Sequence, residues 1–272
     1  MPGLQALSAS LRATKTPHDF ICMVTPDVTL SLVQPQVTRV VPVPYLTFQT
    51  KPMKTAKQRK MYDSWMADSY TKWNALCLTE YSKILFLDLD IIVLENLDHL
   101  FERPTPAATF SSPWAEPFTK TRGAIANPYQ DLRDGDRVSR DLIEMGLHGV
   151  PRGRGTHGKH DPSFVLIATT VLLQPSRTDY ERYVKLVRDS QPFGFENCLS
   201  AFDEQSLSLL YSDWYHISQR YNAIPWHVRT WLLKGEQPAL YHYFNTKPWD
   251  MRREEWPDLE VWYRFYDSAN AT

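Results

Sequence analysis

One stretch of the sequence decides the fold: Tyr81-Ser-Lys-Ile-Leu-Phe-Leu-Asp88-Leu-Asp90-Ile-Ile-Val-Leu-Glu-Asn-Leu-Asp-His-Leu-Phe101. Its segment 84–87 is the strongest strand signal in the chain, and an apolar run of this kind is typical of a strand inside a parallel sheet covered by helices. Asp88 and Asp90 follow at the end of the strand, where carboxylates are costly unless something neutralises them. In open α/β sheets, ligands bind at the carboxyl ends of the strands. The stretch therefore predicts an α/β sheet with a ligand site at this edge.

The two carboxylates have the chemistry of a divalent cation site. Hard oxygen ligands at such an edge suit Mg²⁺ or Mn²⁺ bound together with a diphosphate. A bare Asp-x-Asp pattern is weak, but its position directly behind an apolar strand makes it more specific. We therefore expect Asp88 and Asp90 to hold a metal ion.

Strand and helix signals alternate along the rest of the chain. Expected helices cover residues 4–15, 61–80, 177–188 and 203–210, and expected strands cover residues 20–24, 37–43, 163–173 and 239–244. Such alternation favours a layered α/β fold with a mostly parallel central sheet flanked by helices. Because no repeat or linker divides the chain, we expect a single domain over 1–272. Its nucleotide and metal half is expected at about 1–110, and its acceptor half at about 160–272.

The composition is that of an ordinary globular protein: 272 residues, 43% hydrophobic and 22% charged. Thirty basic against 31 acidic residues leave a net charge of −1, which argues against nucleic-acid binding. No apolar run approaches the roughly 20 residues of a membrane span, and no signal peptide is recognised. The three cysteines are widely spaced, so a disulfide framework is not expected. These features predict a cytoplasmic protein without a membrane span.

Three further segments carry weaker signals. Five of the ten glycines lie between Gly146 and Gly158, which predicts a flexible loop at about 146–160, either a solvated insertion or a mobile lid. A basic run at 51–60 is expected to be a solvated face, with guidance of a phosphorylated donor as the alternative. An aromatic tail at 256–266 is expected to pack as a C-terminal helix.

The sequence resembles that of a known family, the glycogenin-like glycosyltransferases (family 8 of that classification). From Thr71-Lys72 to Phe101 it is similar to the family's lysine-bearing helix and the Tyr-Ser-Lys, Asp-x-Asp and Asn-Leu-Asp-x-Leu-Phe pattern that follows. Further similar motifs come in the family's order: Leu173-Gln-Pro-Ser176, Phe202-Asp-Glu-Gln205, Tyr221-Asn-Ala223 and His242-Tyr-Phe-Asn-Thr-Lys-Pro-Trp249. The resemblance covers nearly the whole chain.

The resemblance implies a GT-A fold and transfer of a sugar from a UDP-sugar to an unknown carbohydrate or protein acceptor. It also implies retention of configuration at the anomeric carbon. The expected cofactor is a divalent ion, Mn²⁺ with Mg²⁺ as the alternative. A homodimer is possible. Asp88, Asp90 and His242 match the family's metal ligands, and an imidazole suits Mn²⁺ better than Mg²⁺. The metal would neutralise charge on the departing UDP.

Four further residues match substrate-binding positions of the family. Lys72 matches the helix lysine near the donor sugar. Lys247 would contact the diphosphate, where a cation stabilises the negative charge that grows during bond cleavage. Asn245 stands near the glycine at which the family's backbone approaches phosphate, and Trp249 closes the same motif.

The residues expected to act on the donor sugar come from one short segment. Glu204 and Gln205 match an acidic–Gln pair that faces the sugar and its anomeric carbon. The acid would bind hydroxyls, and the amide would stabilise oxocarbenium charge or act as a weak nucleophile. Asp203 replaces them if the register differs by one. The structural alternative is that these acids only cap a helix.

Two other functions remain open. The family's opening strand, with a turn that stacks uracil, is not matched, and its Asn-Ala/Ser-Gly motif is replaced by Ile167-Ala-Thr-Thr170. A catalytically degenerate transferase that binds sugars or acts as a scaffold is therefore the alternative. An aspartate-nucleophile phosphatase is a remote third, because only 48 positions separate Asp88 from Asp136, too few for the strands that class places between its acidic motifs.

Overall fold

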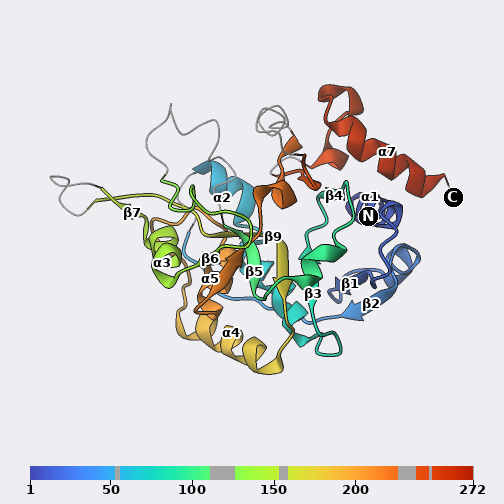
Figure 1. Ribbon diagram of the computed structural model, residues 1–272. Coiled ribbons are helices and arrows are strands. Elements are labelled where there is room, and N and C mark those ends of the chain that lie inside the picture. The colour runs from blue at the N-terminus through green and yellow to red at the C-terminus, as the bar shows by residue number, and fades with distance from the viewer. Residues whose placement is uncertain (53–55, 111–125, 153–158, 226–236, 245–246, 272) are drawn as a thin grey trace.

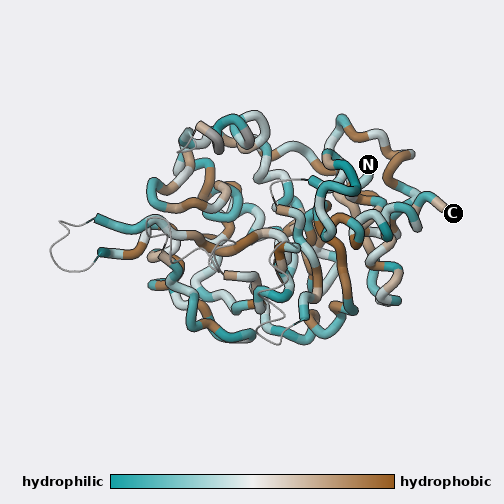
Figure 2. Tube along the Cα trace, turned by 90° about the horizontal axis from the view of Figure 1, so that it is seen from above, coloured by the Kyte–Doolittle hydropathy of each residue, from teal (hydrophilic) through white to brown (hydrophobic). Residues whose placement is uncertain are grey.

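The structure, a computed structural model, describes residues 1–52, 56–110, 126–152, 159–225, 237–244 and 247–271 (Figure 1). Its centre is a five-stranded sheet that helices flank. The strand order across this sheet is β3 (Ile84–Leu87), β9 (Leu166–Leu173), β5 (Ala107–Phe110), β10 (Trp214–His216) and β6 (Arg137–Val138). Hydrophobic segments cross the middle of the molecule, as Figure 2 shows. The predicted α/β class is confirmed.

The central sheet is mixed, which corrects the prediction of a mostly parallel one. β9 runs antiparallel to both β3 and β5, and β10 is parallel to β5 but antiparallel to β6. All eight residues of β9 are buried. An apolar run indicates that both faces of a strand are covered, whichever way its neighbours run. Of this sheet, the sequence pattern predicted β3 and β9 but not the shorter β5, β10 and β6, and it could not show the strand directions.

Three two-stranded sheets complete the β structure. β1 (Ile21–Val24) pairs in parallel with β2 (Arg39–Pro42), and β4 (Ile91–Val93) pairs antiparallel with β11 (Leu240–His242). β7 (Val150–Pro151) and β8 (His160–Asp161) form an antiparallel ribbon. Within the β4–β11 pair, His242 lies opposite Ile91, so this pairing carries the histidine to the residue that follows Asp90.

The α-helices are α1 (Pro2–Ala13), α2 (Ala56–Tyr62), α3 (Arg140–His148), α4 (Arg177–Asp189), α5 (Phe202–Leu210) and α7 (Leu259–Asn270). A long 3₁₀ segment, η3, covers Met66–Cys77, so the helix expected at 61–80 is divided between α2 and η3. Shorter 3₁₀ turns cover Leu30–Leu32, Gln34–Gln36, Asp98–Glu102, Gln219–Asn222, Pro248–Asp250 and Arg253–Glu255. Ser139 and Ser176 cap α3 and α4 by accepting from backbone N–H groups.

The helices pack in two groups. η3, α4 and α5 contact one another, and α5 contacts β9. α1 and α7 lie side by side near both termini (Figure 1). The predicted aromatic C-terminal helix is confirmed there, since Trp262 of α7 is 1% exposed and packs with Tyr263 and Tyr266. No helix in the described ranges is both long and apolar enough to cross a membrane.

The glycine-rich segment is more ordered at its ends than predicted. Gly146 and His148 belong to α3, which ends at Gly149 with a φ of +84°. A Cβ at Gly146 would collide with the Tyr129 hydroxyl and the Phe164 carbonyl, so close packing requires this glycine. The β7–β8 ribbon follows, and residues 153–158 lie outside the described ranges. The predicted loop at 146–160 is therefore corrected at both ends.

Candidate functional site

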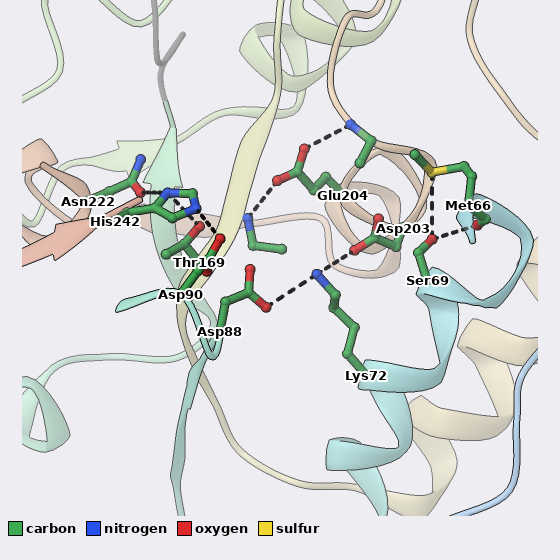
Figure 3. A network of polar contacts seen from close by, with 12 residues as sticks. Met66, Ser69, Lys72, Asp88, Asp90, Thr169, Asp203, Glu204, Asn222 and His242 are labelled. Atoms are coloured by element: carbon green, nitrogen blue, oxygen red, sulfur yellow. Dashed lines mark hydrogen bonds and ion pairs between the residues drawn. The ribbon is translucent and has the colours of Figure 1, made fainter. Parts of the chain in front are cut away.

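Three predicted metal ligands converge at one point. Asp88 and Asp90 lie in the turn between β3 and β4, and His242 is the last residue of β11. One ligand atom from each residue lies within 4.8 Å of the others (Figure 3). Asp90 and His242 are buried, and Asp88 is partly buried. The antiparallel pairing of β4 with β11 therefore completes the cluster that the sequence predicted.

The imidazole of His242 is oriented by two neighbours. Its Nδ1 lies 2.8 Å from Asn222 Oδ1 and 3.2 Å from Thr169 Oγ1, while its Nε2 lies 3.4 Å from Asp90 Oδ2. Since an amide oxygen only accepts, Nδ1 carries the proton and donates to Asn222. Nε2 therefore faces Asp90, and a hydrogen bond of this kind at the other nitrogen is the usual arrangement of a metal-ligating histidine.

Sequence reasoning gave neither of these two neighbours a role. Asn222 was visible only as part of the Tyr221-Asn-Ala223 motif. Thr169 lies in the segment that replaces the family's asparagine motif, and no sequence signal assigned it to the site. Both are buried beside His242.

The environments of the two aspartates differ. Burial acts to raise the pKa of Asp90, but His242 and the ion-paired Lys247 outweigh it and bring the pKa below its usual range. Burial also raises the pKa of Asp88, and there Lys72 does not compensate. Asp90 Oδ1 is buried without a hydrogen-bond partner in the described part of the chain. A buried unpaired acceptor is costly, and a cation beside it would remove that cost.

This donor set fits a divalent metal. Two carboxylates and one imidazole are ligands that first-row divalent ions accept, and an unpaired carboxylate oxygen is available for coordination. Asp88, Asp90 and His242 could therefore hold such an ion.

Lys72 links the metal cluster to α5. Its Nζ lies 3.5 Å from Asp88 Oδ1 and 3.1 Å from Asp203 Oδ2 (Figure 3). Burial acts to lower the pKa of Lys72, but Asp203, Asp88 and Glu204 raise it above its usual value, so the ammonium stays charged. Asp203 itself is only 1% exposed. The acid that α5 brings into ion-pair contact with this network is thus Asp203, the alternative that a one-residue change of register predicted.

The next two residues of α5 face elsewhere. Glu204 accepts from Ala168 N at 3.0 Å with Oε1 and from Ala201 N at 2.9 Å with Oε2. Burial, followed by the charge of Asp203, raises the pKa of Glu204 to about 8. Gln205 accepts from Phe195 N at 2.9 Å and donates to Ser200 O at 2.8 Å, and it is 1% exposed. Both polar atoms of the Gln205 amide are thus engaged by backbone groups of residues 195 and 200, and its role on the donor sugar stays a prediction.

Comparison with known proteins adds sequence relatives. No family model matches the chain. An uncharacterized protein of Acanthamoeba polyphaga mimivirus is 32% identical over 111 residues, 40% of this chain and 37% of that protein. UDP-glucuronate:xylan alpha-glucuronosyltransferase 2 of Arabidopsis thaliana is 34% identical over 101 residues, 33% and 17% of the two chains. Glycogenin-1 of Caenorhabditis elegans is 42% identical over 50 residues, 18% and 12% of the two chains. The chain thus spans less than two fifths of each of these relatives.

A solved structure shows the fold. The crystal structure of the galactosyltransferase LgtC with donor and acceptor sugar analogs aligns with 98% of this chain and 91% of that chain, with a TM-score of 0.52 and 14% identity. Over parts of its length the chain is thus similar to glycogenin and to a plant glucuronosyltransferase, and over nearly all of it the fold is that of LgtC. The GT-A fold predicted from the sequence is confirmed.

The other residues predicted to bind substrate lie in different places. Lys247 joins the cluster through Asp90. Trp249 packs between α1 and α7: its ring lies 6.2 Å from that of Trp262, and a Cβ on Gly3 would approach it to 2.8 Å. Trp249 is partly buried by this packing, and its substrate-binding role stays a prediction. Asn245 lies outside the described residues.

Proposed function

We propose that this chain is a metal-dependent, retaining glycosyltransferase that moves a sugar from a UDP-sugar to a carbohydrate or protein acceptor. The observation that carries the proposal is the convergence of Asp88, Asp90 and His242, with Lys72 and Lys247 in ion-pair contact with the two carboxylates. The name of the Arabidopsis relative gives UDP-glucuronate as its donor, which supports a UDP-linked sugar here.

Asp88, Asp90 and His242 would hold the cation, for which Mn²⁺ is our first choice because the set mixes carboxylates with an imidazole. When bound, the ion would supply Lewis-acid stabilisation of a diphosphate leaving group. Lys247 adds a positive charge beside Asp90, where a diphosphate oxygen would be stabilised. Asn222 holds Nδ1 of His242 and so orients Nε2 toward the cation.

On the sugar side we assign the main role to Asp203. Lys72 holds this almost fully buried carboxylate by a 3.1 Å ion pair. A fixed negative charge stabilises the positive charge that develops at an anomeric carbon. Glu204, whose pKa is about 8, is mainly protonated at neutral pH and supports the helix that carries Asp203. Gln205 has no place in this mechanism.

The test is release of UDP from a panel of UDP-sugars (glucose, galactose, xylose and glucuronate) with Mn²⁺ or with EDTA. We expect one sugar to react only with metal, and proton NMR of the product to show the anomeric configuration of the donor. UDP binding that needs Mn²⁺ but is never followed by release or transfer would replace the enzyme by the sugar-binding or scaffold alternative. Release that EDTA does not affect would contradict the metal assignment.

A further inference from the structure

An exposed indole stands at the start of η3. Trp65 is 45% exposed and directly precedes Met66, which begins η3 and is only 2% exposed. Asp68 N donates to Trp65 O at 3.0 Å, and Ser69 Oγ donates to Met66 O at 2.8 Å. The first turn of η3 is therefore hydrogen-bonded and anchored to the core by Met66, while the residue before it stays at the surface.

Tyr62 holds this indole in place. The two rings lie 5.6 Å apart at 86°, an edge-to-face arrangement that aromatic pairs prefer. Tyr62 ends α2 and packs, partly buried, against the main core cluster, and its carbonyl accepts from Trp65 N at 3.1 Å. The exposed ring is therefore positioned by a neighbour that is itself fixed to the core. Little side-chain freedom remains to be lost when a ligand covers such a ring.

η3 connects Trp65 to the candidate site. Lys72, in the same segment, forms the 3.1 Å ion pair with Asp203 of α5. η3 and α5 contact each other, and Ser69 lies on the far side of Asp203 from Asp88 (Figure 3). The start of η3 is therefore on the α5 side of the site, away from the metal cluster.

Tyr62 lies on the same side. Burial, followed by the charge of Glu204, raises the pKa of the Tyr62 hydroxyl. A charge acts on a hydroxyl in this way only at short range, so Tyr62 lies near the start of α5. Tyr62 and Trp65 thus form an aromatic pair beside the part of the site that we assign to the donor sugar.

The residues next to the indole are polar. Asp63 and Ser64 directly precede Trp65, and both are exposed. An indole offers a flat apolar face, and a carboxylate and a hydroxyl beside it form hydrogen bonds. A pyranose ring has the complementary surface, because one face carries C–H groups and its hydroxyls stand around the edge. An interface with a protein would instead surround such an anchor with further apolar side chains. The patch therefore fits a sugar ring.

The separation along η3 calls for more than one sugar unit. A 3₁₀ helix rises about 2.0 Å per residue, so the seven positions from Trp65 to Lys72 span roughly 14 Å. A single pyranose ring is shorter than this. An acceptor that reaches Asp203, the partner of Lys72, and also covers Trp65 is therefore an oligosaccharide.

We propose that Trp65, supported by Tyr62, is an acceptor subsite that binds one ring of an oligosaccharide by stacking, while another ring of the same chain receives the transferred sugar near Asp203. The inference rests on the proposed sugar transfer, and it narrows the acceptor from a carbohydrate or protein to an oligosaccharide. Because the indole stands away from the metal cluster, the subsite should bind an oligosaccharide without metal or donor.

The first experiment is calorimetry of xylotetraose, cellotetraose and maltotetraose, without metal or donor. We expect at least one of them to bind saturably, and Trp65→Ala to weaken that binding about fivefold or more because the stacking surface is lost. Trp65→Phe keeps part of that surface and should give an intermediate affinity. Trp256→Ala is the matched control: Trp256 is 46% exposed but precedes α7, which packs on α1, and this variant should bind as the unmodified protein does.

Two results of this calorimetry would overturn the proposal. One is that none of the three tetrasaccharides binds at millimolar concentration. The other is that Trp65→Ala, shown by urea titration to be folded, binds a tetrasaccharide as tightly as the unmodified protein does.

The second experiment locates the sugar on the protein. After labelling with fluorotryptophan, the fluorine NMR signal of Trp65 is the one that Trp65→Phe removes, and Trp256→Phe identifies the control signal in the same way. The Trp65 signal should shift as the tetrasaccharide is added, while the Trp256 signal stays unchanged. A shift confined to other indoles would contradict the proposal. If Trp65→Ala fails to fold, this result decides.

UDP distinguishes failure of the subsite from failure of the proposed transfer. With Mn²⁺, Trp65→Ala should bind UDP as the unmodified protein does, and an equal loss of UDP and tetrasaccharide binding would place the indole at the nucleotide and overturn the subsite. Tetrasaccharide binding at Trp65 without release of UDP from any UDP-sugar would remove the transfer and keep the indole as a sugar-binding surface. Release of UDP without tetrasaccharide binding would keep the transfer and remove the subsite.

Discussion

The turn after β3 and the first turn of α5 both carry neighbouring acids, yet they use them differently. After β3, Asp88 and Asp90 approach the same point beside His242. At the start of α5, Asp203 pairs with Lys72, while the next two side chains bond to backbone groups of other segments. Asp88 and Asp90 thus meet at one site. Of the second pair, Asp203 belongs to the ion-pair network of that site, whereas Glu204 supports the helix.

Local geometry explains the difference. The short turn between β3 and β4 brings both aspartates to His242, while Leu89 between them is 42% exposed. Successive residues of a helix point in directions about 100° apart, so neighbours such as Asp203 and Gln205 cannot face one ligand together. Two acids directly after a strand are therefore better evidence of a common ligand site than two acids at the start of a helix.

The largest expected effect comes from a substitution of Asp90, in the turn after β3. Asp90→Asn removes a ligand charge that Lys247 and His242 both face, and should lower metal-dependent UDP release at least 100-fold, as loss of about 3 kcal/mol of transition-state stabilisation would. Initial rates over a range of Mn²⁺ concentrations measure it. Asp213→Asn, which disrupts an exposed ion pair with Arg137, is the control and should keep full activity. Full activity of Asp90→Asn in metal-depleted buffer would remove the metal assignment.

The second largest effect is expected for Lys72, which links the turn after β3 to α5. Lys72→Met leaves the almost fully buried Asp203 without its cation, and should reduce the free energy of unfolding by about 3 kcal/mol. Urea titration measures this. Adding Asp203→Asn should recover most of the stability without restoring activity. A double variant as unstable as Lys72→Met alone would mean that the ion pair is not the cause.

Substitutions of Gln205 and Asp203, both in the first turn of α5, should have different effects. Gln205→Ala removes two buried hydrogen bonds, to Phe195 N and Ser200 O, and should cost about 1–3 kcal/mol of stability. Turnover per folded molecule should remain within twofold of the unmodified protein, whereas Asp203→Asn should abolish most of it. Loss of turnover in Gln205→Ala with an unchanged urea midpoint would mean that Gln205 acts in the site as Asp203 does.

The smallest effect is a pH dependence at Glu204. Its pKa is raised from 4.5 to about 8, so between these values the folded chain holds a proton that the unfolded chain has lost. The free energy of unfolding should therefore fall as pH rises through this window and level off above about pH 8. Glu204→Gln does not titrate, and its deficit at pH 5, from one lost backbone bond, should shrink by about 1 kcal/mol or more by pH 8. Parallel curves for the two proteins would show that Glu204 does not hold this proton.

The same contrast shows what the sequence could reveal. The apolar segment 84–87 and the acids behind it predicted β3 and a site with two carboxylates at its end, because these follow from local pattern and spacing, whereas His242 was assigned only through the family resemblance. The direction of β9 and the orientation of Gln205 depend on which segment lies beside them, so local pattern could not supply them. Asn222 and Thr169 reach His242 only through the tertiary fold.

The measurement that tests the central claim most directly is calorimetry of UDP binding with and without Mn²⁺, on the unmodified protein and on Asp90→Asn. We predict binding that is tight only with Mn²⁺ and that Asp90→Asn weakens at least tenfold. UDP binding that is absent with Mn²⁺, or that is equal without it, would contradict the assignment of Asp88, Asp90 and His242 to a metal–diphosphate site.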